Sequence, residues 1–350
     1  MKFIHIADVH LGASPEAGSS YSENRAKELW NSLENVVKIC NEEQTDLLLI
    51  AGDLFHRQPL LRELKEVNYI FADLINTKVV LIAGNHDYLK ASSFYRKFKW
   101  CDCVYPLMGE ELQYVEFPRL KTCVYGLSYG QKEITEPLYD RAFPARKQPI
   151  EILLAHGGDK KHIPFRKENL LQLDYDYVAL GHIHRPTEVE YEKAYYSGSL
   201  EPTDVNDLGS HGFIRGEIVN GKVSVEFVPF ASREYIHTEV MVQEHMTGRE
   251  VREKIMKIVQ ERGVENIYKI TLTGMRDPDI LFDLDAMDAY GNIVEIVDTT
   301  RPAYDYKKLA SQNKDNLLGR FIENMQETLN GSMEYQALAE GVSALLESME

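Results

Sequence analysis

The chain has 350 residues, of which 44% are hydrophobic, and its formal net charge is −16 at pH 7. This length is enough for one large core and one or two smaller domains. The negative charge repels nucleic acid unless bound cations or a local basic strip reverse its sign, so it argues against a simple DNA-binding protein.

The hydrophobic residues are dispersed, and no run approaches the roughly 18 apolar residues of a membrane span. Met1 opens directly into the strand-like segment FIHIADVH, without the regions of a signal peptide, so we expect a cytoplasmic protein with no membrane partner. Four cysteines are too few for a disulfide framework, and the single CxC pair lacks partners for structural zinc. Buried or edge thiols are therefore expected at Cys40, Cys101, Cys103 and Cys123.

Strand-like and helix-like segments alternate in the first hundred residues. A first strand is followed by an amphipathic helix over about residues 23–43 and by the buried strand of DLLLIAGDLFH at residues 46–56. A second helix is expected over residues 59–76, with Pro59 at its first helical position, and then the strand KVVLIAG. This repeated βαβ pattern predicts a parallel sheet.

After residue 111 the sequence changes to aromatic-rich segments in which apolar and polar residues alternate. The apolar runs IEILLAHGG and YVALGHIH follow. Three further strand-like segments follow, and Asn220 with Gly221 predicts a type I′ hairpin between the last two. We predict an α/β fold over residues 1–231, a four-layer αββα sandwich with two sheets face to face and helices outside.

Two smaller parts are expected beyond this domain. Residues 232–301 contain a strand, a helix over residues 247–261 and two more strands, which predicts a small α+β domain. Residues 302–350 form a C-terminal helical segment with a break at Asn330 and Gly331. Its heptad-like apolar positions are Leu309, Leu317, Leu318, Phe321, Met325 and Leu329.

Five strand ends in the first domain deliver side chains that bind metals, and chemistry collects at the carboxyl ends of such strands. Each group alone is common in turns, and only the joint pattern predicts a site. Carboxylate, amide and imidazole together suit two adjacent divalent cations of borderline softness, which can hold both oxygens of a displacement at phosphorus. The pattern predicts phosphoester hydrolysis from Asp8 and His10; Asp53; Asn85, His86 and Asp87; His156; and His182 and His184.

The residue types also suggest a division of roles. A carboxylate has two oxygens and a full charge, so Asp53 suits a bridge between two cations, whereas the single amide oxygen of Asn85 suits a terminal place. A neighbouring carboxylate favours a protonated imidazole, so His86 beside Asp87 can act as a general acid. We expect His5 in the core and no site role for the remaining histidines, which are His162, His211, His237 and His245.

The motifs D-x-H, GD, GNHD, H and GHIH, in this order, resemble the signature of calcineurin-like metallophosphoesterases over about residues 1–230. GDLFH, GHIHRP and YSGSLEP resemble the DNA-repair exonuclease branch of that family, the SbcD and YhaO type. The resemblance implies that Asp8, His10 and His184 hold one metal, that Asn85, His156 and His182 hold the other, and that Asp53 bridges them. It also implies that His86 stabilises the transition state or protonates the leaving oxygen, oriented by Asp87, and that His56 is an extra active-site histidine near the DNA.

The same resemblance implies a DNA exonuclease or single-strand endonuclease of DNA repair, acting on single strands or duplex ends as a monomer or homodimer. The two ions would be Mn²⁺, although Fe and Zn suit the same ligands. The small α+β domain would be a cap beside the active site, and the C-terminal helices would dock on an SMC-like ATPase partner or pack on the chain itself. Five basic residues are candidates for DNA contacts, although they could equally be solvated surface side chains. They are Arg57, Arg62, Arg166, Lys167 and Arg185.

Two other functions stay open. A phosphodiesterase or phosphatase for small molecules or phosphoproteins would use the same metal ligands, and the net charge of −16 favours it. A non-catalytic scaffold on the same fold is disfavoured because every ligand position and His86 are filled.

Overall fold

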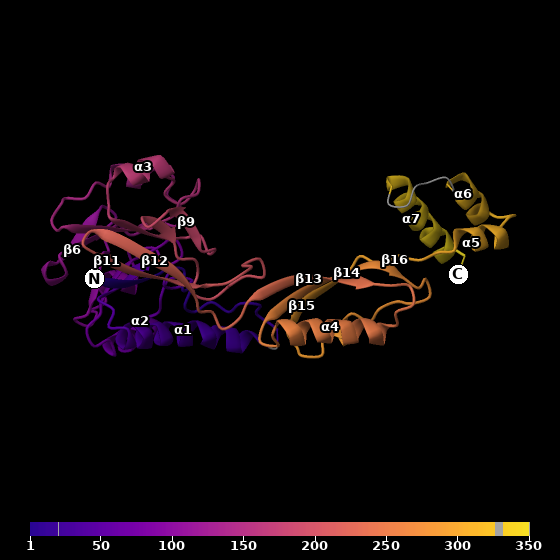
Figure 1. Cartoon of the computed structure of the whole chain (residues 1–350), viewed down its shortest axis with the longest axis horizontal. Helices are drawn as coiled ribbons and strands as arrows, with labels where there is room; N and C mark the ends of the chain where they lie inside the picture. The colour runs from indigo at the N-terminus through magenta and orange to yellow at the C-terminus, as the bar shows by residue number, and fades with distance from the viewer. Residues whose placement is uncertain (20, 326–331, 350) are drawn as a thin grey trace. The chain divides into compact units, whose positions relative to one another are not determined.

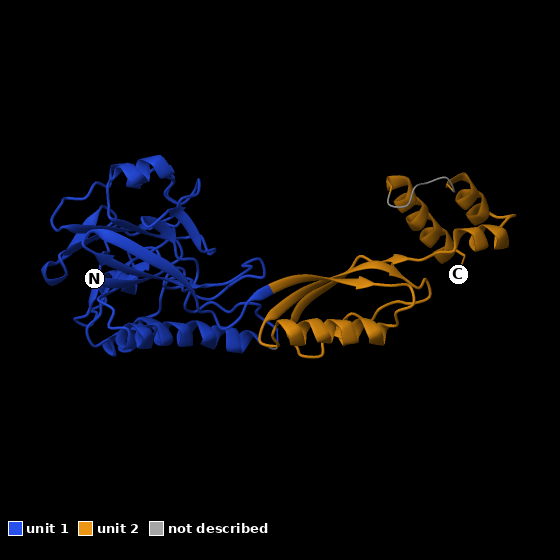
Figure 2. Cartoon of the chain, viewed as in Figure 1, with its two compact units in different colours: residues 1–235 blue, residues 236–350 orange. Residues whose placement is uncertain are grey.

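The computed structural model describes residues 1–19, 21–325 and 332–349. It divides into two compact units, residues 1–235 (unit 1) and residues 236–350 (unit 2), which Figure 2 colours separately. We keep the predicted domain boundaries at residues 231 and 301 as a proposal. The predicted helix break at Asn330 and Gly331, and Leu329 before it, lie outside the described residues. No helix among the described residues is long and apolar enough to cross a membrane.

Unit 1 contains two six-stranded sheets (Figure 1). The first sheet has the order β12-β11-β1-β2-β3-β4, and its strands are β1 (Lys2–Ile6), β2 (Leu47–Ala51), β3 (Lys78–Ile82), β4 (Val104–Pro106), β11 (Gly212–Val219) and β12 (Lys222–Pro229). The second has the order β5-β6-β7-β8-β10-β9, and its strands are β5 (Gln113–Phe117), β6 (Thr122–Gly126), β7 (Ile150–His156), β8 (Tyr177–Gly181), β9 (Thr187–Glu190) and β10 (Ala194–Tyr196). Strands β1 to β4 run parallel, as predicted.

Alternation along the central strands builds the four layers. On β2, Leu48 and Ile50 pack against the helices α1 (Ser22–Glu42) and α2 (Leu61–Ala72), whereas Leu47 and Leu49 point the other way, into the core between the two sheets. The far face of the second sheet packs against α3 (Lys167–Gln172) and η3 (Leu138–Arg141). The predicted αββα sandwich is confirmed in unit 1.

Helix α2 begins later than predicted. Pro59 lies before the N-cap residue Leu60, because the carboxylate of Glu63 accepts the backbone N–H of Leu60 at 2.8 Å and fixes the helix start there. The helix also ends at Ala72, where the Asn41 side chain accepts the N–H of Ile75 at 2.9 Å. The predicted helix over residues 59–76 was therefore too long at both ends, because the apolar pattern continues into the turns that flank the helix.

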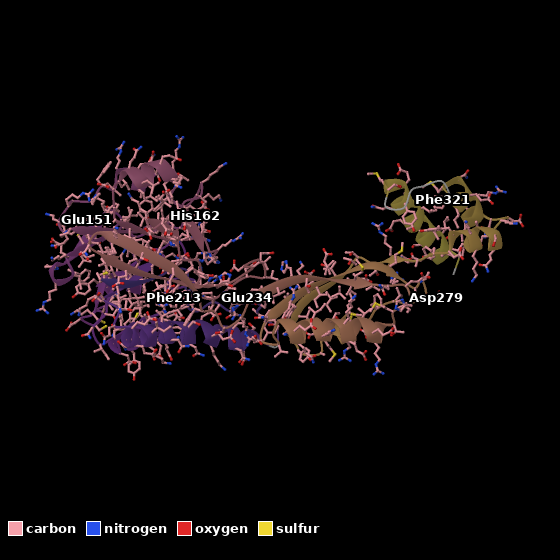
Figure 3. All side chains as sticks on the ribbon, in the orientation of Figure 1. Glu151, His162, Phe213, Glu234, Asp279 and Phe321 are labelled. Carbon is pink, nitrogen blue, oxygen red and sulfur yellow. The ribbon has the colours of Figure 1, made fainter. Side chains whose placement is uncertain are left out.

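Two smaller expectations agree with the structure. Asn220 and Gly221 both have positive φ, 52° and 76°, as a type I′ hairpin requires. The four cysteines are free, with Cys40 and Cys123 buried. Phe213 of β11, labelled in Figure 3, is buried beneath α1 and α2. The short 3₁₀ helices η1 (Phe94–Lys97) and η2 (Pro118–Leu120) complete unit 1.

Unit 2 has a sheet of four strands and four α-helices among its described residues. Its elements are β13 (Tyr235–Val242, whose first residue belongs to unit 1), α4 (Gly248–Arg262), β14 (Ile267–Arg276), η4 (Asp285–Met287), β15 (Ile293–Asp298), β16 (Arg301–Pro302), α5 (Tyr306–Gln312), α6 (Leu317–Met325) and α7 (Met333–Glu347). Thr247 caps α4 through a capping box with Glu250. Helices α5 to α7 share a small apolar core around Leu318, Ile322 and Val342.

His5 of β1 is fully buried between the sheets, where its Nδ1 lies 3.0 Å from the Tyr177 hydroxyl. Burial lowers the pKa of this imidazole from 6.5 to about 3. The folded chain therefore keeps His5 neutral, whereas the unfolded chain takes up a proton below about pH 6.5. Stability is present above pH 6.5 and is lost as the pH falls toward 3.

This linkage predicts the effect of His5→Asn, which keeps a polar atom near the Nδ1 position. In the wild type, His5 alone removes about 2 kcal/mol of unfolding free energy between pH 7 and pH 5. Urea unfolding of the metal-free protein should show that the variant lacks this part of the acid-induced loss. His245→Asn, at an exposed position of unit 2, is the control and should behave as the wild type. Identical acid-induced losses in the wild type and His5→Asn would contradict the assignment.

Candidate metal centre

The loops that follow β1 and β2 run side by side and bring the first predicted ligands together. The backbone N–H of Asp8 donates to the carbonyl of Gly52, and that of His10 donates to the carbonyl of Asp53, both at 3.1 Å. The two loops stay paired as far as Leu11 and Phe55. The D-x-H segment is thereby held beside the carboxylate of Asp53.

Residues of the second sheet close the site from the other side. His156 is the last residue of β7, and its Nδ1–H donates to the carbonyl of Ala51 at 2.9 Å. After β8, the backbone N–H of His182 donates to Oδ2 of Asp8 at 2.8 Å. Two hydrogen bonds therefore join the carboxyl ends of strands from different sheets at this point.

Two glycines are needed for this close approach. A Cβ atom at Gly84 would lie 2.2 Å from Oδ1 of Asp53, and one at Gly52 would lie 2.4 Å from Nδ1 of His156. Gly52 also has a φ of +93°, which side chains rarely adopt. The GD and GNHD motifs thus owe their glycines to the space that the buried side chains occupy.

The structure brings all seven predicted metal ligands together. Nε2 of His10 lies 3.0 Å from Nε2 of His184, and a ligand atom of Asp8 lies within 4.8 Å of both. Oδ1 of Asn85 lies 2.9 Å from Nε2 of His156 and 3.1 Å from Nδ1 of His182. Oδ2 of Asp53 lies 3.3 Å from Nε2 of His156.

Three features of the structure fit divalent cations at these residues. Oδ1 of Asp8 is buried and has no hydrogen-bond partner among the described residues, which is costly for a carboxylate oxygen. The nitrogens of His10 and His184 converge on one point, as ligands of one ion do. Backbone strain is concentrated here, because Asp8, His10, Asp53 and His182 all have positive φ. The residues present therefore fit the cations that the motif pattern predicts.

The three carboxyl groups of the site differ in their electrostatics. Burial raises the pKa of Asp8 to about 6, and burial together with the charge of Asp53 raises the pKa of Asp87 to about 8. Burial acts on Asp53 too, but the charge of His156 and the hydrogen bond that it donates outweigh burial and hold the pKa of Asp53 well below its usual range. Asp53 is the fixed negative charge at the centre of the site.

The histidines divide in the same way. Burial would lower the pKa of both His156 and His184, but nearby carboxylates outweigh burial and raise each pKa to about 9. The carboxylate of Asp53 acts on His156, and those of Asp207 and Asp8 act on His184. Burial holds the pKa of His10 well below its usual value and, with the charge of His156, lowers that of His182 to about 4. A cation bound by His156 and His184 at neutral pH must therefore displace protons.

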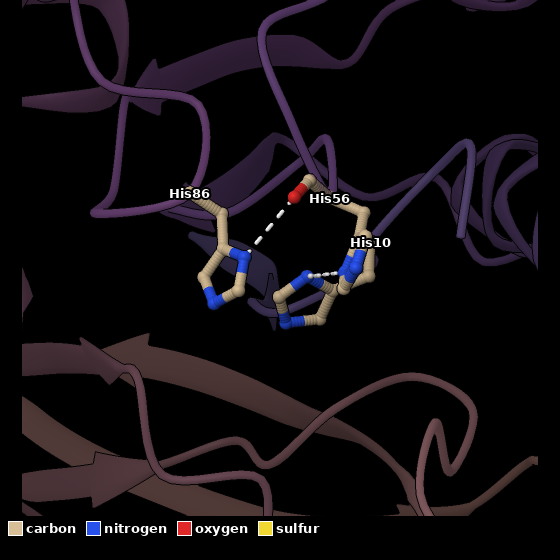
Figure 4. Close-up of side chains that lie close together, drawn as sticks. All are labelled: His10, His56 and His86. Carbon is tan, nitrogen blue, oxygen red and sulfur yellow. Dashed lines mark hydrogen bonds between the residues drawn. The ribbon is translucent and has the colours of Figure 1, made fainter. Parts of the chain in front are cut away.

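His56, His86 and His10 form a group of imidazoles (Figure 4), of which His56 is exposed, His86 is half-buried and His10 is buried. Nδ1–H of His86 donates to the backbone carbonyl of His56 at 3.0 Å, and its ring lies 5.2 Å from the ring of His56. Nδ1 of His56 lies 3.4 Å from Nδ1 of His10. The three predicted residues are thus neighbours around one opening.

That Asp87 orients His86 stays a prediction, and the contacts of Asp87 are with backbone groups. Both oxygens of Asp87 accept backbone N–H groups, Oδ1 from Gly84 at 2.8 Å and Oδ2 from Phe55 at 3.2 Å. This buried carboxyl group ties together the loops after β2 and β3, and the carbonyl of His56 fixes the His86 ring instead. Because that loop carries His86, we still expect Asp87 to position His86 through the backbone.

Sequence reasoning missed three residues around the GHIH motif. His162 was expected to have no role in the site, but its ring lies 4.5 Å from that of His182 and both contact Asp159. Asp207 contacts His184, at 3.1 Å between Oδ2 and Nδ1. Asp159 could have been found because it follows the HGG at the end of β7, whereas Asp207 lies in a loop without any pattern.

Of the other three histidines, His211 agrees with expectation only in part, whereas His237 and His245 agree with it. His211 lies in a loop, as expected, but it is buried, and its Nε2–H donates to the carbonyl of Asp207 at 3.1 Å. It supports the loop that carries Asp207. His237 and His245 are exposed in unit 2.

The five predicted DNA-contacting residues are all exposed or half-buried, but two are already paired. Arg57 forms an ion pair with Glu63 at 2.7 Å, and Lys167 forms one with Glu190 at 2.8 Å. Arg62, Arg166 and Arg185 are exposed. The charges that face solvent are therefore fewer than the sequence suggests.

The model of the calcineurin-like phosphoesterase family matches residues 1–186, a range that holds the seven ligands and the loops after β1, β2, β3, β7 and β8. The chain belongs to the calcineurin-like phosphoesterase family. Members of this family use divalent metals to hydrolyse phosphoesters, so unit 1 is a metal-dependent phosphoester hydrolase. The family resemblance of the motifs is thereby confirmed.

Curated relatives include a nuclease subunit and a DNA repair protein. The chain is 28% identical over 248 residues to the uncharacterized metallophosphoesterase YhaO of Bacillus subtilis, covering 65% of this chain and 60% of the relative. It is 31% identical over 216 residues to the DNA double-strand break repair protein Mre11 of Methanocaldococcus jannaschii, covering 57% of each. It is 25% identical over 266 residues to a subunit of the nuclease SbcCD of Staphylococcus saprophyticus, covering 65% of this chain and 69% of the relative. The chain spans about three fifths of the length of the first two relatives.

Because Asp53 lies at the centre of the ligands, we expect Asp53→Asn to weaken both metal sites, whereas Asn85→Ala should first weaken one. After dialysis against limiting Mn²⁺, metal analysis should find about two ions per chain in the wild type, about one in Asn85→Ala and well below one in Asp53→Asn. Asp204→Asn makes the same charge change at an exposed position and is the control. A full equivalent of metal retained by Asp53→Asn would show that Asp53 is not shared.

Proposed function

We propose that this phosphoesterase is a DNA nuclease that hydrolyses phosphodiester bonds with two divalent ions, as an exonuclease or single-strand endonuclease in DNA repair. The observation that carries the proposal is that the half-buried His86 and the exposed His56 lie beside His10, so two imidazoles are added to a complete ligand set. Relatives named as a nuclease subunit and as a double-strand break repair protein support it.

Asp8, His10 and His184 would hold one ion and Asn85, His156 and His182 the other, with Asp53 shared. The contacts among these side chains support this division, because His10 faces His184 and Asn85 faces both His156 and His182. When bound, the two ions supply positive charge that polarises the phosphoryl group and makes water a stronger nucleophile at neutral pH. Mn²⁺ is the expected metal, and Fe or Zn suits the same donors.

His86 is held as a proton donor to a leaving oxygen would be. Its backbone N–H donates to Oδ1 of Asp53 at 2.8 Å, and its Nδ1–H donates to the carbonyl of His56 at 3.0 Å. Nε2 is then the nitrogen that is free to meet substrate. In the imidazolium form Nε2 also carries a proton, and we assign to this N–H the donation of a hydrogen bond, and then of its proton, to the oxygen that departs from phosphorus.

His56 is not a predicted ligand, but it lies next to the predicted ligand His10 and to His86. Its side chain is exposed, and its ring is 5.3 Å from that of His10 and 5.2 Å from that of His86. A small ester needs to reach only the ligands and His86. A nucleic acid strand extends beyond the reacting phosphate, and His56 is suited to contact that extension.

The net charge of −16 favours the second candidate, a phosphodiesterase or phosphatase for small molecules or phosphoproteins. Long-range repulsion would slow the approach of DNA at low ionic strength. Two divalent ions bound at the ligands would reverse the sign of the charge locally. DNA stays our first choice because His56 has no evident use on a small substrate.

We also propose that the C-terminal helices of unit 2 bind an SMC-like ATPase partner. One relative is by its name a subunit of the nuclease SbcCD, which supports a chain that works within an assembly. Leu317 of α6 and Met333 of α7 are 67% and 81% exposed, although both residue types are usually buried. Loss of association with the ATPase after removal of residues 302–350, with nuclease activity kept, would support this assignment.

Substrate length is the test of the proposed function. With Mn²⁺, the protein should degrade single-stranded or duplex oligonucleotides labelled at either end, and a chelator should abolish this. His86→Ala should lower turnover of DNA by about 10² to 10⁴-fold, because it removes the proton donor. It should lower turnover of bis-p-nitrophenyl phosphate much less, because p-nitrophenolate leaves without being protonated. His56→Ala should lower DNA turnover at least about tenfold and leave the small ester within about threefold.

The control is His245→Ala, which should change neither activity. Hydrolysis of the small ester without cleavage of any DNA would favour the second candidate. Equal losses on both substrates in His56→Ala would remove the argument that separates the two.

A further inference from the structure

His182 and His184 stand two residues apart after β8, yet each is backed by a different carboxylate. Oδ2 of Asp159 lies 2.8 Å from Nε2 of His182, and Oδ2 of Asp207 lies 3.1 Å from Nδ1 of His184. An ionised carboxylate only accepts hydrogen bonds, so the contacted nitrogen must carry the proton. The two neighbouring histidines therefore present different nitrogens to their carboxylates.

The nitrogens left free point to the predicted ligands. Nδ1 of His182 lies 3.1 Å from Oδ1 of Asn85, and Nε2 of His184 lies 3.0 Å from Nε2 of His10. A ring nitrogen can bind a cation only when it carries no proton. We infer that Asp159 and Asp207 are positioning residues that fix opposite tautomers of His182 and His184, so that one metal is bound through Nδ1 and the other through Nε2. This inference rests on the proposed two-metal site.

The two oxygens of Asp159 have separate roles. Oδ1 accepts the backbone N–H of Lys161 at 2.7 Å and that of His162 at 3.0 Å, which closes the loop after β7. Oδ2 lies 2.8 Å from Nε2 of His182 and 2.8 Å from Nδ1 of His162. Nδ1 of His162 also lies 3.0 Å from Oδ1, so His162 can use either oxygen. Loop closure needs only Oδ1, whereas the contact with His182 is made by Oδ2 alone.

Asp207 differs from Asp159, because a single oxygen, Oδ2, accepts all the hydrogen bonds described below. Its Oδ2 accepts the backbone N–H of Thr203 at 2.9 Å and that of Asp204 at 3.2 Å, in addition to Nδ1–H of His184. The hydroxyl of Thr203 also donates to it at 3.1 Å. These donors all converge on a single oxygen.

This difference predicts unequal effects of the same substitution. In Asp159→Asn, the amide oxygen is needed at Oδ1 by the loop, so the NH₂ group faces Nε2 of His182. Two donors cannot face each other, and the imidazole proton moves to Nδ1, which removes the nitrogen that binds metal. In Asp207→Asn, the amide oxygen can replace Oδ2 and all its donors keep an acceptor. A role based on charge alone would make the two variants equivalent.

The experiment measures tautomers and metal affinity in the full chain. In ¹⁵N-histidine-labelled, chelated protein, long-range ¹H–¹⁵N spectra should show the His182 proton on Nε2 in the wild type and on Nδ1 in Asp159→Asn. Titration with Mn²⁺, followed by calorimetry and electron paramagnetic resonance, should show one of the two sites weakened about 10- to 100-fold in Asp159→Asn. Asp207→Asn should change affinity less than about threefold, whereas Asp207→Ala should weaken the other site about 10- to 100-fold.

The controls are Asp204→Asn and Glu133→Gln, which make the same charge change at exposed positions of the same region. Equal weakening in Asp159→Asn and Asp207→Asn, or an unchanged His182 tautomer in Asp159→Asn, would overturn the inference. This test can be told apart from the test of the proposed function. A chain that binds two Mn²⁺ ions but cleaves no DNA would refute the nuclease proposal, and the His182 tautomer and the Mn²⁺ affinities would still test the roles of Asp159 and Asp207. The tautomer of chelated protein is decisive even if metal binds with another stoichiometry.

Discussion

The structure of unit 1 depends on keeping the carboxylate of Asp53 ionised while it is 1% exposed. A buried charge is costly unless it is paired and hydrogen-bonded. Here the backbone N–H of His86 donates to Oδ1, and the imidazole of His156 lies beside Oδ2. These partners come from both sheets, so the two sheets must meet at the carboxyl ends of β2 and β7.

The loops that meet this requirement are themselves constrained. Asp8, His10 and Asp53 adopt positive φ, which costs of order 1 kcal/mol or more for residues with a side chain, and the hydrogen bonds between the two loops hold them there. Gly52 and Gly84 leave room that a methyl group would fill. The three apolar cores between and around the sheets offset the stability lost at this edge. A strained, polar edge on a well-packed sandwich is typical of a functional site.

Sequence reasoning predicted what depends on local pattern. Alternating apolar residues identified the central strands, and the rule that polar residues after strands share one sheet edge brought together all seven ligands. It failed where a contact is set by tertiary structure alone. Asp207 and His184 are 23 residues apart with no periodicity between them, and the two backbone partners of Asp87 become visible only when the loops after β2 and β3 are side by side. Helix α2 was predicted too long because the apolar pattern does not reveal that Glu63 caps it at Leu60.

The central claim is that two ions share Asp53, and anomalous diffraction from a crystal grown with Mn²⁺ tests it most directly. The account predicts two manganese peaks, one bonded to Asp8, His10 and His184 and the other to Asn85, His156 and His182, with Asp53 bonded to both. A single peak, or two peaks of which only one contacts Asp53, would contradict it.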